Sequence, residues 1–278
     1  MITDNGFTCT KVRQQVYESI QDMLAACDAA YKAGRTNDRF NRPAFIGRAF
    51  TGWADVVSKV GEYWPEGLDL VQEMLFELRN ATGQARPRSR VRKGRWSADD
   101  GDEIDVDRLR AGQDCWRQTI REEHDAPQTL CLVFALTTPA KRRSDEVLWR
   151  GAVAIILADL LEACGYRVEL WGVNYCICAY RDGSSAFQAV RLKPSQSPVD
   201  IASLVSGIAG WFYRTVVFQS YHVEKPRPTS GLGRTLTIDE DLPFVRELAG
   251  NARVLTIDGV WDRYAAENKV QEVMKSLS

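Results

Sequence analysis

Residues 86–95 form a basic stretch whose side chains could bind phosphate groups. Its six cations are Arg86, Arg88, Arg90, Arg92, Lys93 and Arg95. In an extended chain, alternate arginines point to one side about 7 Å apart, close to the phosphate spacing of an extended single strand. Each phosphate that a cation neutralises releases counterions, so such an arm adds affinity without sequence specificity. The alternative is that the stretch pairs with the acidic residues beside it and stays solvated.

A second basic cluster, Lys141, Arg142 and Arg143, follows a predicted buried strand. Open α/β sheets bind ligands beyond the carboxyl ends of such strands, and the two basic clusters could share a face. Together they make up a nucleic-acid-binding hypothesis, although a net charge of −1 is unlike that of a dedicated nucleic-acid binder. Nearby, Thr137, Thr138 and Ser144 could hold an anion at a helix start, or simply cap it.

An acidic run follows the basic stretch and suggests a third kind of chemistry. It consists of Asp99, Asp100, Asp102, Glu103, Asp105 and Asp107. Clustered carboxylates suit Ca²⁺ or Mg²⁺, and a metal-dependent hydrolase or nuclease would use them. The spacing does not fit an EF-hand loop, and a solvated loop is the usual behaviour of such a run. We therefore assign no metal and no cofactor.

Other catalytic patterns are weak in this sequence. The chain has two histidines, His124 and His222, and either could form a nucleophilic pair with Cys176 or Cys178. Cys-Ile-Cys on a strand places both sulfurs on one face, which is typical of packing. No Walker A loop, Gly-x-Ser-x-Gly or His-Glu-x-x-His occurs. We predict no catalytic residue, and a non-catalytic protein is favoured over an enzyme.

An aromatic run offers a protein-interface candidate instead. Trp211, Phe212 and Tyr213 are consecutive, and Phe218 and Tyr221 follow closely. Exposed aromatic patches tend to mark interfaces, whereas the alternative for these residues is packing in the core.

The elements that position these residues centre on a strand, a helix and a second strand. Residues 130–136 are almost continuously apolar, as in a strand that is covered on both faces. Ser144 is a plausible N-cap for a helix over residues 147–164, whose narrow polar face holds Arg150, Asp159 and Glu162. Gly165 would stop that helix, and residues 167–173 form the next, parallel strand.

Periodicity and turn residues predict the remaining elements. Helices are expected over residues 11–32, 53–60, 68–80, 242–248 and 264–277, and from residue 201 onward. A hairpin turn at 181–184 leads to an antiparallel strand over 187–192, which we expect at the sheet edge, and 254–257 is the last strand. A short helix after Asp105 would be anchored by Val106, Leu109 and Trp116. The predicted fold class is α/β: a mostly parallel sheet with helices on both faces, preceded by an α-helical N-terminal region.

Three regions follow from this layout: a helical region 1–84, a charged linker with a short helix 85–127, and an α/β sheet domain 128–278. Apolar residues make up 45% of the 278 residues and charged ones 26%, as in ordinary globular proteins. Seven cysteines without zinc-like spacing suggest reduced thiols. Neither the N-terminus nor any apolar run resembles a membrane or secretion signal, so we expect a cytoplasmic protein without a membrane partner.

The order of elements after residue 128 resembles the von Willebrand factor A-type fold. Metal-binding members of that fold carry Asp-x-Ser-x-Ser after the first strand. The matching residues here are Ala135-Leu136-Thr137-Thr138-Pro139, with no aspartate. The resemblance therefore implies a metal-free version of this domain.

Most of the chain also resembles an uncharacterised family of phage-encoded proteins. The shared motifs are Tyr63-Trp64-Pro65-Glu66-Gly67, Asp105-Val106 with Leu109 and Gly112, and Arg150-Gly151-Ala152 leading to Leu161-Glu162 and residues 165–170. The resemblance implies a phage origin, and with it a location in the host-cell cytoplasm or in a virion, but no activity. Our first hypothesis is a non-catalytic protein-interaction or assembly protein, with a partner protein or self-association. Nucleic-acid binding through the basic stretch and metal-dependent hydrolysis through the acidic run are the alternatives.

Overall fold

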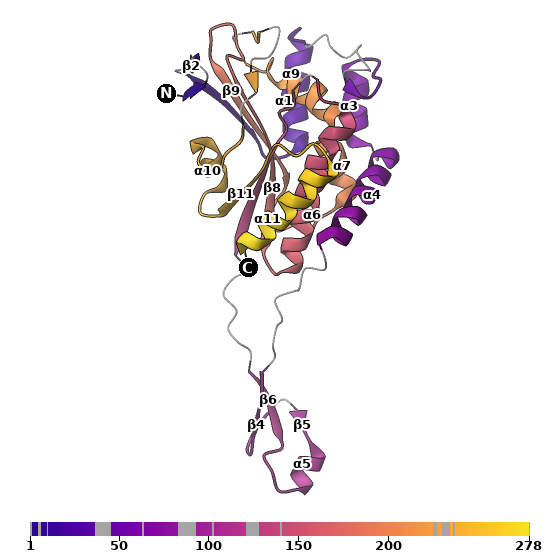
Figure 1. Ribbon diagram of the computed structural model, residues 1–278, viewed down its shortest axis with the longest axis vertical. Helices are drawn as coiled ribbons and strands as arrows, with labels where there is room; N and C mark the ends of the chain where they lie inside the picture. The colour runs from indigo at the N-terminus through magenta and orange to yellow at the C-terminus, as the bar shows by residue number, and fades with distance from the viewer. Residues whose placement is uncertain are drawn as a thin grey trace.

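The structure is a computed structural model (Figure 1). It describes residues 2–4, 7–9, 11–36, 46–62, 64–82, 93–101, 103–120, 128–139, 141–224, 227–229, 234–235 and 237–277. Several residues singled out above lie outside this part of the chain: Arg86, Arg88, Arg90, Arg92, Asp102 and His124.

Strands and helices both occur throughout the described chain. The strands are β1 Ile2–Asp4, β2 Phe7–Cys9, β3 Val12–Tyr17, β4 Lys93–Ser97, β5 Glu103–Ile104, β6 Trp116–Ile120, β7 Thr129–Ala135, β8 Arg167–Ile177, β9 Ser185–Lys193, β10 Arg234–Thr235 and β11 Arg253–Ile257. The helices are α1 Ile20–Lys32, α3 Trp53–Gly61, α4 Pro65–Thr82, α5 Val106–Arg110, α6 Ser144–Ala163, α7 Ile201–Ile208, α8 Gly210–Phe212, the π-helical η2 Tyr213–Val217, α9 Phe218–Ser220, α10 Pro243–Ala249 and α11 Arg263–Leu277.

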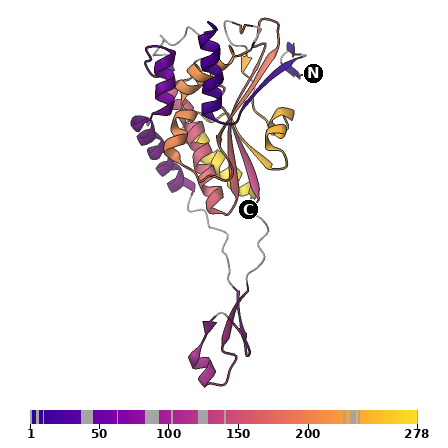
Figure 2. The same cartoon turned by 180° about the vertical axis from the view of Figure 1, so that it is seen from behind.

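The main sheet has the strand order β11-β7-β8-β9-β3, and β10 pairs with the end of β8. β11, β7 and β8 are parallel, β9 is antiparallel to β8, and β3 runs parallel to β9. Helices α1, α6, α7 and α11 lie on one side of this sheet and α10 on the other (Figure 2). This arrangement confirms the predicted α/β fold with a mostly parallel sheet and helices on both faces.

The central β7-α6-β8 unit matches the sequence prediction, because its dense apolar residues have to be buried in the core. β7 is buried from Leu130 onward, as expected of a strand covered on both faces. Gly151 lets α6 approach α7, since an added Cβ would lie 2.4 Å from Cβ of Ile208. Gly165 has φ of 89° and ends the helix as predicted.

Two local predictions about α6 are wrong. Ser144 is the first helical residue, and Arg143 is the N-cap. The Glu146 carboxylate accepts the Arg143 backbone N–H at 2.7 Å, so the helix start is capped from within. Arg150, assigned to the narrow polar face of the helix, is buried.

The predicted helix over residues 11–32 is also wrong in its first part. Residues 12–17 form β3, which pairs with β9 from Val12 opposite Ser185 to Tyr17 opposite Val190. The helix α1 begins only after Ser19, whose hydroxyl accepts the Asp22 N–H at 3.1 Å. Consequently β3, and not β9, lies at this edge of the sheet. The boundaries proposed at residues 84 and 127 stay predictions.

A small unit of residues 93–101 and 103–120 lies apart from the main sheet (Figure 1). It holds a three-stranded antiparallel sheet in the order β4-β6-β5, together with the short helix α5. The helix confirms the expectation of a short helix after Asp105. Its expected anchors Val106 and Leu109 are exposed, at 50% and 52%, so that part of the prediction is wrong.

Candidate functional site

Arg150 of α6 is the centre of the contacts at the carboxyl end of β7. Its guanidinium is 1% exposed and donates to the Thr137 carbonyl at 3.1 Å and to Thr138 Oγ1 at 3.0 Å. A third contact, at 3.4 Å, reaches Asp258 just after β11. Burial lowers the pKa of Arg150 to about 10 while the Asp258 carboxylate opposes that shift, so the guanidinium stays charged near neutral pH.

The Trp261 ring contacts two arginines at this end of the sheet, one of which is Arg150 of the ion pair. The guanidinium carbons of Arg142 and Arg150 lie 4.8 and 4.6 Å from the centre of its ring. Arg142 also pairs with Glu146 at 2.8 Å, and its backbone carbonyl accepts a hydrogen bond from Arg214 at 2.6 Å. Arg214 reaches this place from the π-helical turn η2 and is buried. Through these contacts the arginines tie α6 and η2 to the segments that follow β7 and β11.

The predicted anion site at the start of α6 is not formed. The Thr138 hydroxyl donates to the Leu136 carbonyl at 3.0 Å, and that of Thr137 donates to Asn174 Oδ1 at 3.2 Å. Ser144 donates to the Ile46 carbonyl at 3.4 Å. The Glu146 carboxylate already occupies the helix start, where it would repel an anion. The alternative, that these hydroxyls cap the helix, is not observed either, since Arg143 is the N-cap and the three hydroxyls donate elsewhere.

A row of buried amide side chains crosses the sheet next to this end. Asn174, Gln188 and Gln15 lie opposite one another on β8, β9 and β3. Asn174 Nδ2 donates to Gln188 Oε1 at 2.6 Å, and Gln188 Nε2 donates to Gln15 Oε1 at 2.8 Å. Ser220 of α9 and Tyr221 after it add contacts to the same amides at 2.5 and 2.6 Å. All three amides are at most 6% exposed.

This amide row was missed at the level of sequence. The signal was a polar residue inside each apolar strand, as in Val173-Asn174-Tyr175 and Phe187-Gln188-Ala189. Amides neither ionise nor attack near neutral pH, so the row is suited to fixing strand register and not to catalysis. Burial raises the pKa of the adjacent Cys176 thiol to about 12, which makes it a poor nucleophile.

The acidic run does not gather into a metal site within the described residues. Asp105 caps α5 by accepting the N–H groups of Asp107 and Arg108 at 3.0 and 3.1 Å. Glu103 lies 3.9 Å from Arg117, and Asp107 lies 3.8 Å from Arg110. In the part of the chain that the structure describes, no group of three or more His, Cys, Asp or Glu side chains could hold a metal ion.

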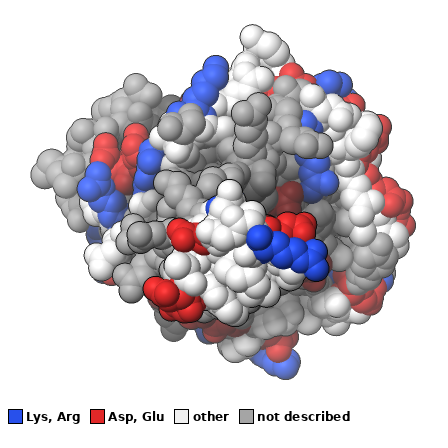
Figure 3. Space-filling view, turned by 90° about the horizontal axis from the view of Figure 1, so that it is seen from below, with Lys and Arg blue, Asp and Glu red and all other residues white. Residues whose placement is uncertain are grey.

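The two basic clusters are not brought together in the described structure. Lys93 and Arg95 belong to β4 in the small unit, which precedes the amino end of β7. Lys141, Arg142 and Arg143 follow the carboxyl end of β7, and Arg143 pairs with Asp145 at 2.9 Å. Seen from the side of the small unit, basic and acidic side chains lie next to one another (Figure 3). Nucleic-acid binding by these residues stays a prediction.

The aromatic run is part of the core, which corrects the predicted interface. Trp211, Phe212 and Tyr213 are 2%, 0% and 3% exposed. The Trp211 ring lies 5.6 Å from Phe50 and 5.9 Å from Trp64. Core packing, the alternative for these residues, is therefore correct.

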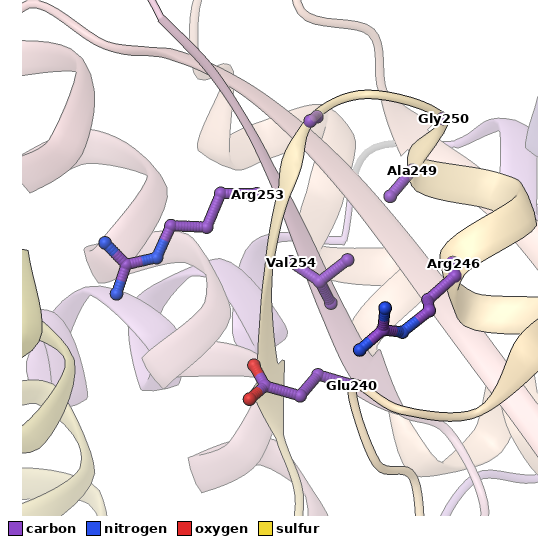
Figure 4. Close-up of a pocket in the computed structure, with 7 residues that line it drawn as sticks. Glu240, Arg246, Ala249, Gly250, Arg253 and Val254 are labelled. Carbon is purple, nitrogen blue, oxygen red and sulfur yellow. The ribbon is translucent and has the colours of Figure 1, made fainter.

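Beside β11, an open hollow of about 390 Å³ is the pocket shown in Figure 4. Arg246, Arg253 and Glu240 contribute charged side chains to it. Arg246 pairs with Asp241, and Arg253 donates to the Ser276 carbonyl at 3.2 Å. Both arginines already have partners, and the Glu240 carboxylate in the same hollow would repel an anion. The pocket therefore does not define an anion site.

The small unit leaves three large aliphatic side chains exposed, and no contact described above accounts for them. Ile104, Val106 and Leu109, here called the aliphatic triad, are 41%, 50% and 52% exposed. Among the side chains of this unit that the structure describes, only Cys115 is buried. Arg108 covers the Trp96 ring at 4.4 Å, which shields one more apolar group. The triad is left facing solvent.

The fold and these sites define an α/β protein. An ion pair, Arg150–Asp258, lies at the carboxyl ends of the parallel strands, and a small antiparallel sheet is attached to the domain. The chain belongs to the family described as a domain of unknown function (DUF7192), which matches residues 4–278. This confirms the expected membership of an uncharacterised family. No curated protein and no solved structure matches the chain. No single helix in the described residues is long and apolar enough to cross a membrane, whereas one pair bent by 49°, Ile201–Ile208 with Gly210–Ser220, meets that test jointly.

Proposed function

We propose that this protein is a non-catalytic protein-interaction or assembly protein and that its small unit carries the contact surface. The observation behind this proposal is the exposed aliphatic triad of the small unit. Among the side chains of this unit that the structure describes, only Cys115 is buried. The phage origin and the host-cytoplasmic or virion location belong to the same proposal. They rest on the family resemblance.

The size of the small unit supports this role. Folded units below about 40 residues usually need disulfides, metals or association with another chain, because their own core is too small. Cys115 is a free thiol, and no metal cluster exists among the described residues. Covering a half-exposed valine, leucine or isoleucine gains roughly 1 kcal/mol each. A partner seated on the triad would therefore stabilise the unit and bind through it.

The main sheet supports the A-type-like part of the proposal. The order β9-β8-β7-β11, with a helical connection between β7 and β8, agrees with that resemblance. Metal-binding members hold their ion after the first strand, which corresponds to β7. Here the buried guanidinium of Arg150 lies at that end and pairs with Asp258. A fixed positive charge in this position disfavours a divalent cation, which supports a metal-free domain.

Site-specific photocrosslinking tests the proposed function. A photoreactive amino acid replaces Leu109 in the full chain, expressed in the cells in which the protein normally acts. The matched control places it at Gln113, which is exposed in the same unit. We expect a discrete covalent adduct from position 109 and none from position 113. Equal or absent labelling at the two positions would overturn the proposal.

Nucleic-acid binding is the second candidate, and one observation favours it. The end of the basic stretch is extended, since Lys93 and Arg95 belong to strand β4. An extended backbone is the conformation that places alternate cations on one side.

A further inference from the structure

We propose that Gln15, Tyr17 and Tyr180 bind a cluster of internal water molecules, and we call these three residues the internal hydration site. They belong to β3 and to the turn that joins β8 to β9. The site belongs to the main domain and goes beyond the function proposed for the small unit.

The three side chains are polar groups in the interior of the main domain. Gln15, Tyr17 and Tyr180 are 6%, 6% and 1% exposed. In the part of the chain that the structure describes, Gln15 Nε2 and the two tyrosine hydroxyls have no hydrogen-bond partner. Buried polar groups in folded proteins are nearly always paired, either with protein atoms or with ordered water. Three such groups in one region indicate a bound polar ligand.

The three groups lie on the same face of the sheet. Arg13, Gln15 and Tyr17 are alternate residues of β3, so their side chains share one face of this strand. Tyr180 packs against that face, since the guanidinium carbon of Arg13 lies 5.4 Å from the centre of its ring. Burial raises the pKa of both tyrosine hydroxyls, and the nearby Glu224 carboxylate raises both further. One carboxylate that acts on both hydroxyls places them in the same part of the interior.

The amide row leads to the same place from the other side. The Tyr221 ring lies 6.0 Å from that of Tyr180, and the Tyr221 hydroxyl accepts a hydrogen bond from Asn174 at 2.6 Å. Asn174 is linked through Gln188 to Gln15. The amide row therefore ends at the internal hydration site, with Gln15 Nε2 as its last donor.

The chemistry of these groups selects a small neutral ligand. An amide nitrogen can only donate, whereas each tyrosine hydroxyl can both donate and accept. The amide donor disfavours a cation. An anion is disfavoured by the neighbouring charges, because Arg13 pairs with Asp182 at 2.8 Å and lies 4.0 Å from Glu224. Water donates and accepts at once, and internal waters typically make about three hydrogen bonds to such groups.

Urea unfolding of the full chain separates a hydrated hydroxyl from an unpartnered one by the sign of the effect. Removing a hydroxyl that binds water should lower the urea midpoint of Tyr17→Phe and of Tyr180→Phe by roughly 0.2–0.5 M. Removing a buried hydroxyl that binds nothing should raise the midpoint or leave it unchanged. The matched control is Tyr31→Phe, which alters a residue that is 36% exposed and should leave the midpoint unchanged.

A high-resolution crystal structure of the unaltered chain shows the ligand directly. We expect an ordered water oxygen about 2.6–3.2 Å from at least two of the three polar atoms. Midpoints that are raised or unchanged in both phenylalanine variants would overturn the proposal. So would a crystal structure in which these atoms bond only to protein. Either failure leaves the proposed function standing, because the photocrosslinking experiment probes the small unit alone.

Discussion

Arg150 and Asp258 join the ends of β7, α6 and β11 through an ion pair whose guanidinium is buried, with 3.4 Å between Nη1 and Oδ1. The Asp258 carboxylate also accepts the backbone N–H of Ile238 at 3.0 Å and that of Gly259 at 2.6 Å. One carboxylate therefore compensates a buried cation and satisfies two backbone donors on either side of β11. The pair is a structural clasp at the end of the sheet where open α/β sheets generally bind ligands.

Removing one member of this clasp should destabilise the protein more than removing both. Asp258→Ala leaves the Arg150 charge buried without its partner, and we expect a loss of about 3 kcal/mol in the free energy of unfolding. Adding Arg150→Met removes the buried, uncompensated charge and should recover part of the lost free energy of unfolding. Chemical denaturation measures both values. Equal losses for the single and double variants would contradict the clasp.

The amide row makes a second prediction about stability. Gln188→Leu leaves polar atoms of Asn174 and Gln15 buried without their partner, which should cost about 2–4 kcal/mol. The control Gln14→Leu changes an exposed residue of β3 and should cost less than about 0.5 kcal/mol. Urea unfolding compares the two. Similar small losses would show that the row contributes nothing to stability.

Helix α6 should contribute strongly to stability, because most of its side chains are buried. Ile156 and Leu160 are 0% and 8% exposed. Changing either to Ala should cost about 2–5 kcal/mol through lost burial and a residual cavity. A measured loss under about 1 kcal/mol for both would place the core elsewhere.

Local patterns could predict β7, α6 and β8, because their apolar residues are dense and their end signals strong. β3 could not be separated from α1, since Val12 and Val16 are four residues apart and also fit a helical stripe. What makes residues 12–17 a strand is pairing with β9, more than 150 residues away in sequence. Such a partner leaves no local signal.

The candidate sites were harder to predict for the same reason. The sequence placed Arg150 on the polar face of its helix but could not show its buried ion pair, because its partner Asp258 is 108 positions away. Sequence placed Lys141, Arg142 and Arg143 correctly after the first strand of the sheet. It could not show that Arg142 and Arg143 pair with Glu146 and Asp145. Likewise, Val106 and Leu109 have the spacing of core anchors, and only the three-dimensional structure shows them without a core to join.

Acid should weaken the hairpin turn between β8 and β9 through Asp182. Hydrogen bonds from Ser184 and then from Arg13, which lies 2.8 Å away, hold the pKa of Asp182 well below its usual range. A lowered folded-state pKa stabilises the fold above the unfolded pKa of about 3.9, and this contribution is lost as pH falls below it. Asp182→Asn should reduce this loss of stability at acid pH. Thermal unfolding between about pH 5 and 2 would show it, and an unchanged limb would contradict the assignment.

The last prediction concerns the basic stretch 86–95, whose arginines 86, 88, 90 and 92 lie outside the described residues. If it engages nucleic acid, affinity for a single-stranded oligonucleotide should fall steeply between low and physiological salt, since each phosphate contact releases counterions. Changing the four arginines to serine should reduce the slope of log affinity against log salt by up to about 3, near 0.7 per lost contact on a single strand. The control Lys141→Ser with Arg143→Ser alters the cluster beyond the other end of β7 and should leave most of that slope in place. Fluorescence anisotropy provides the measurement. No binding to single- or double-stranded nucleic acid at low salt would remove the polyanion hypothesis and leave a solvated connector to the small unit.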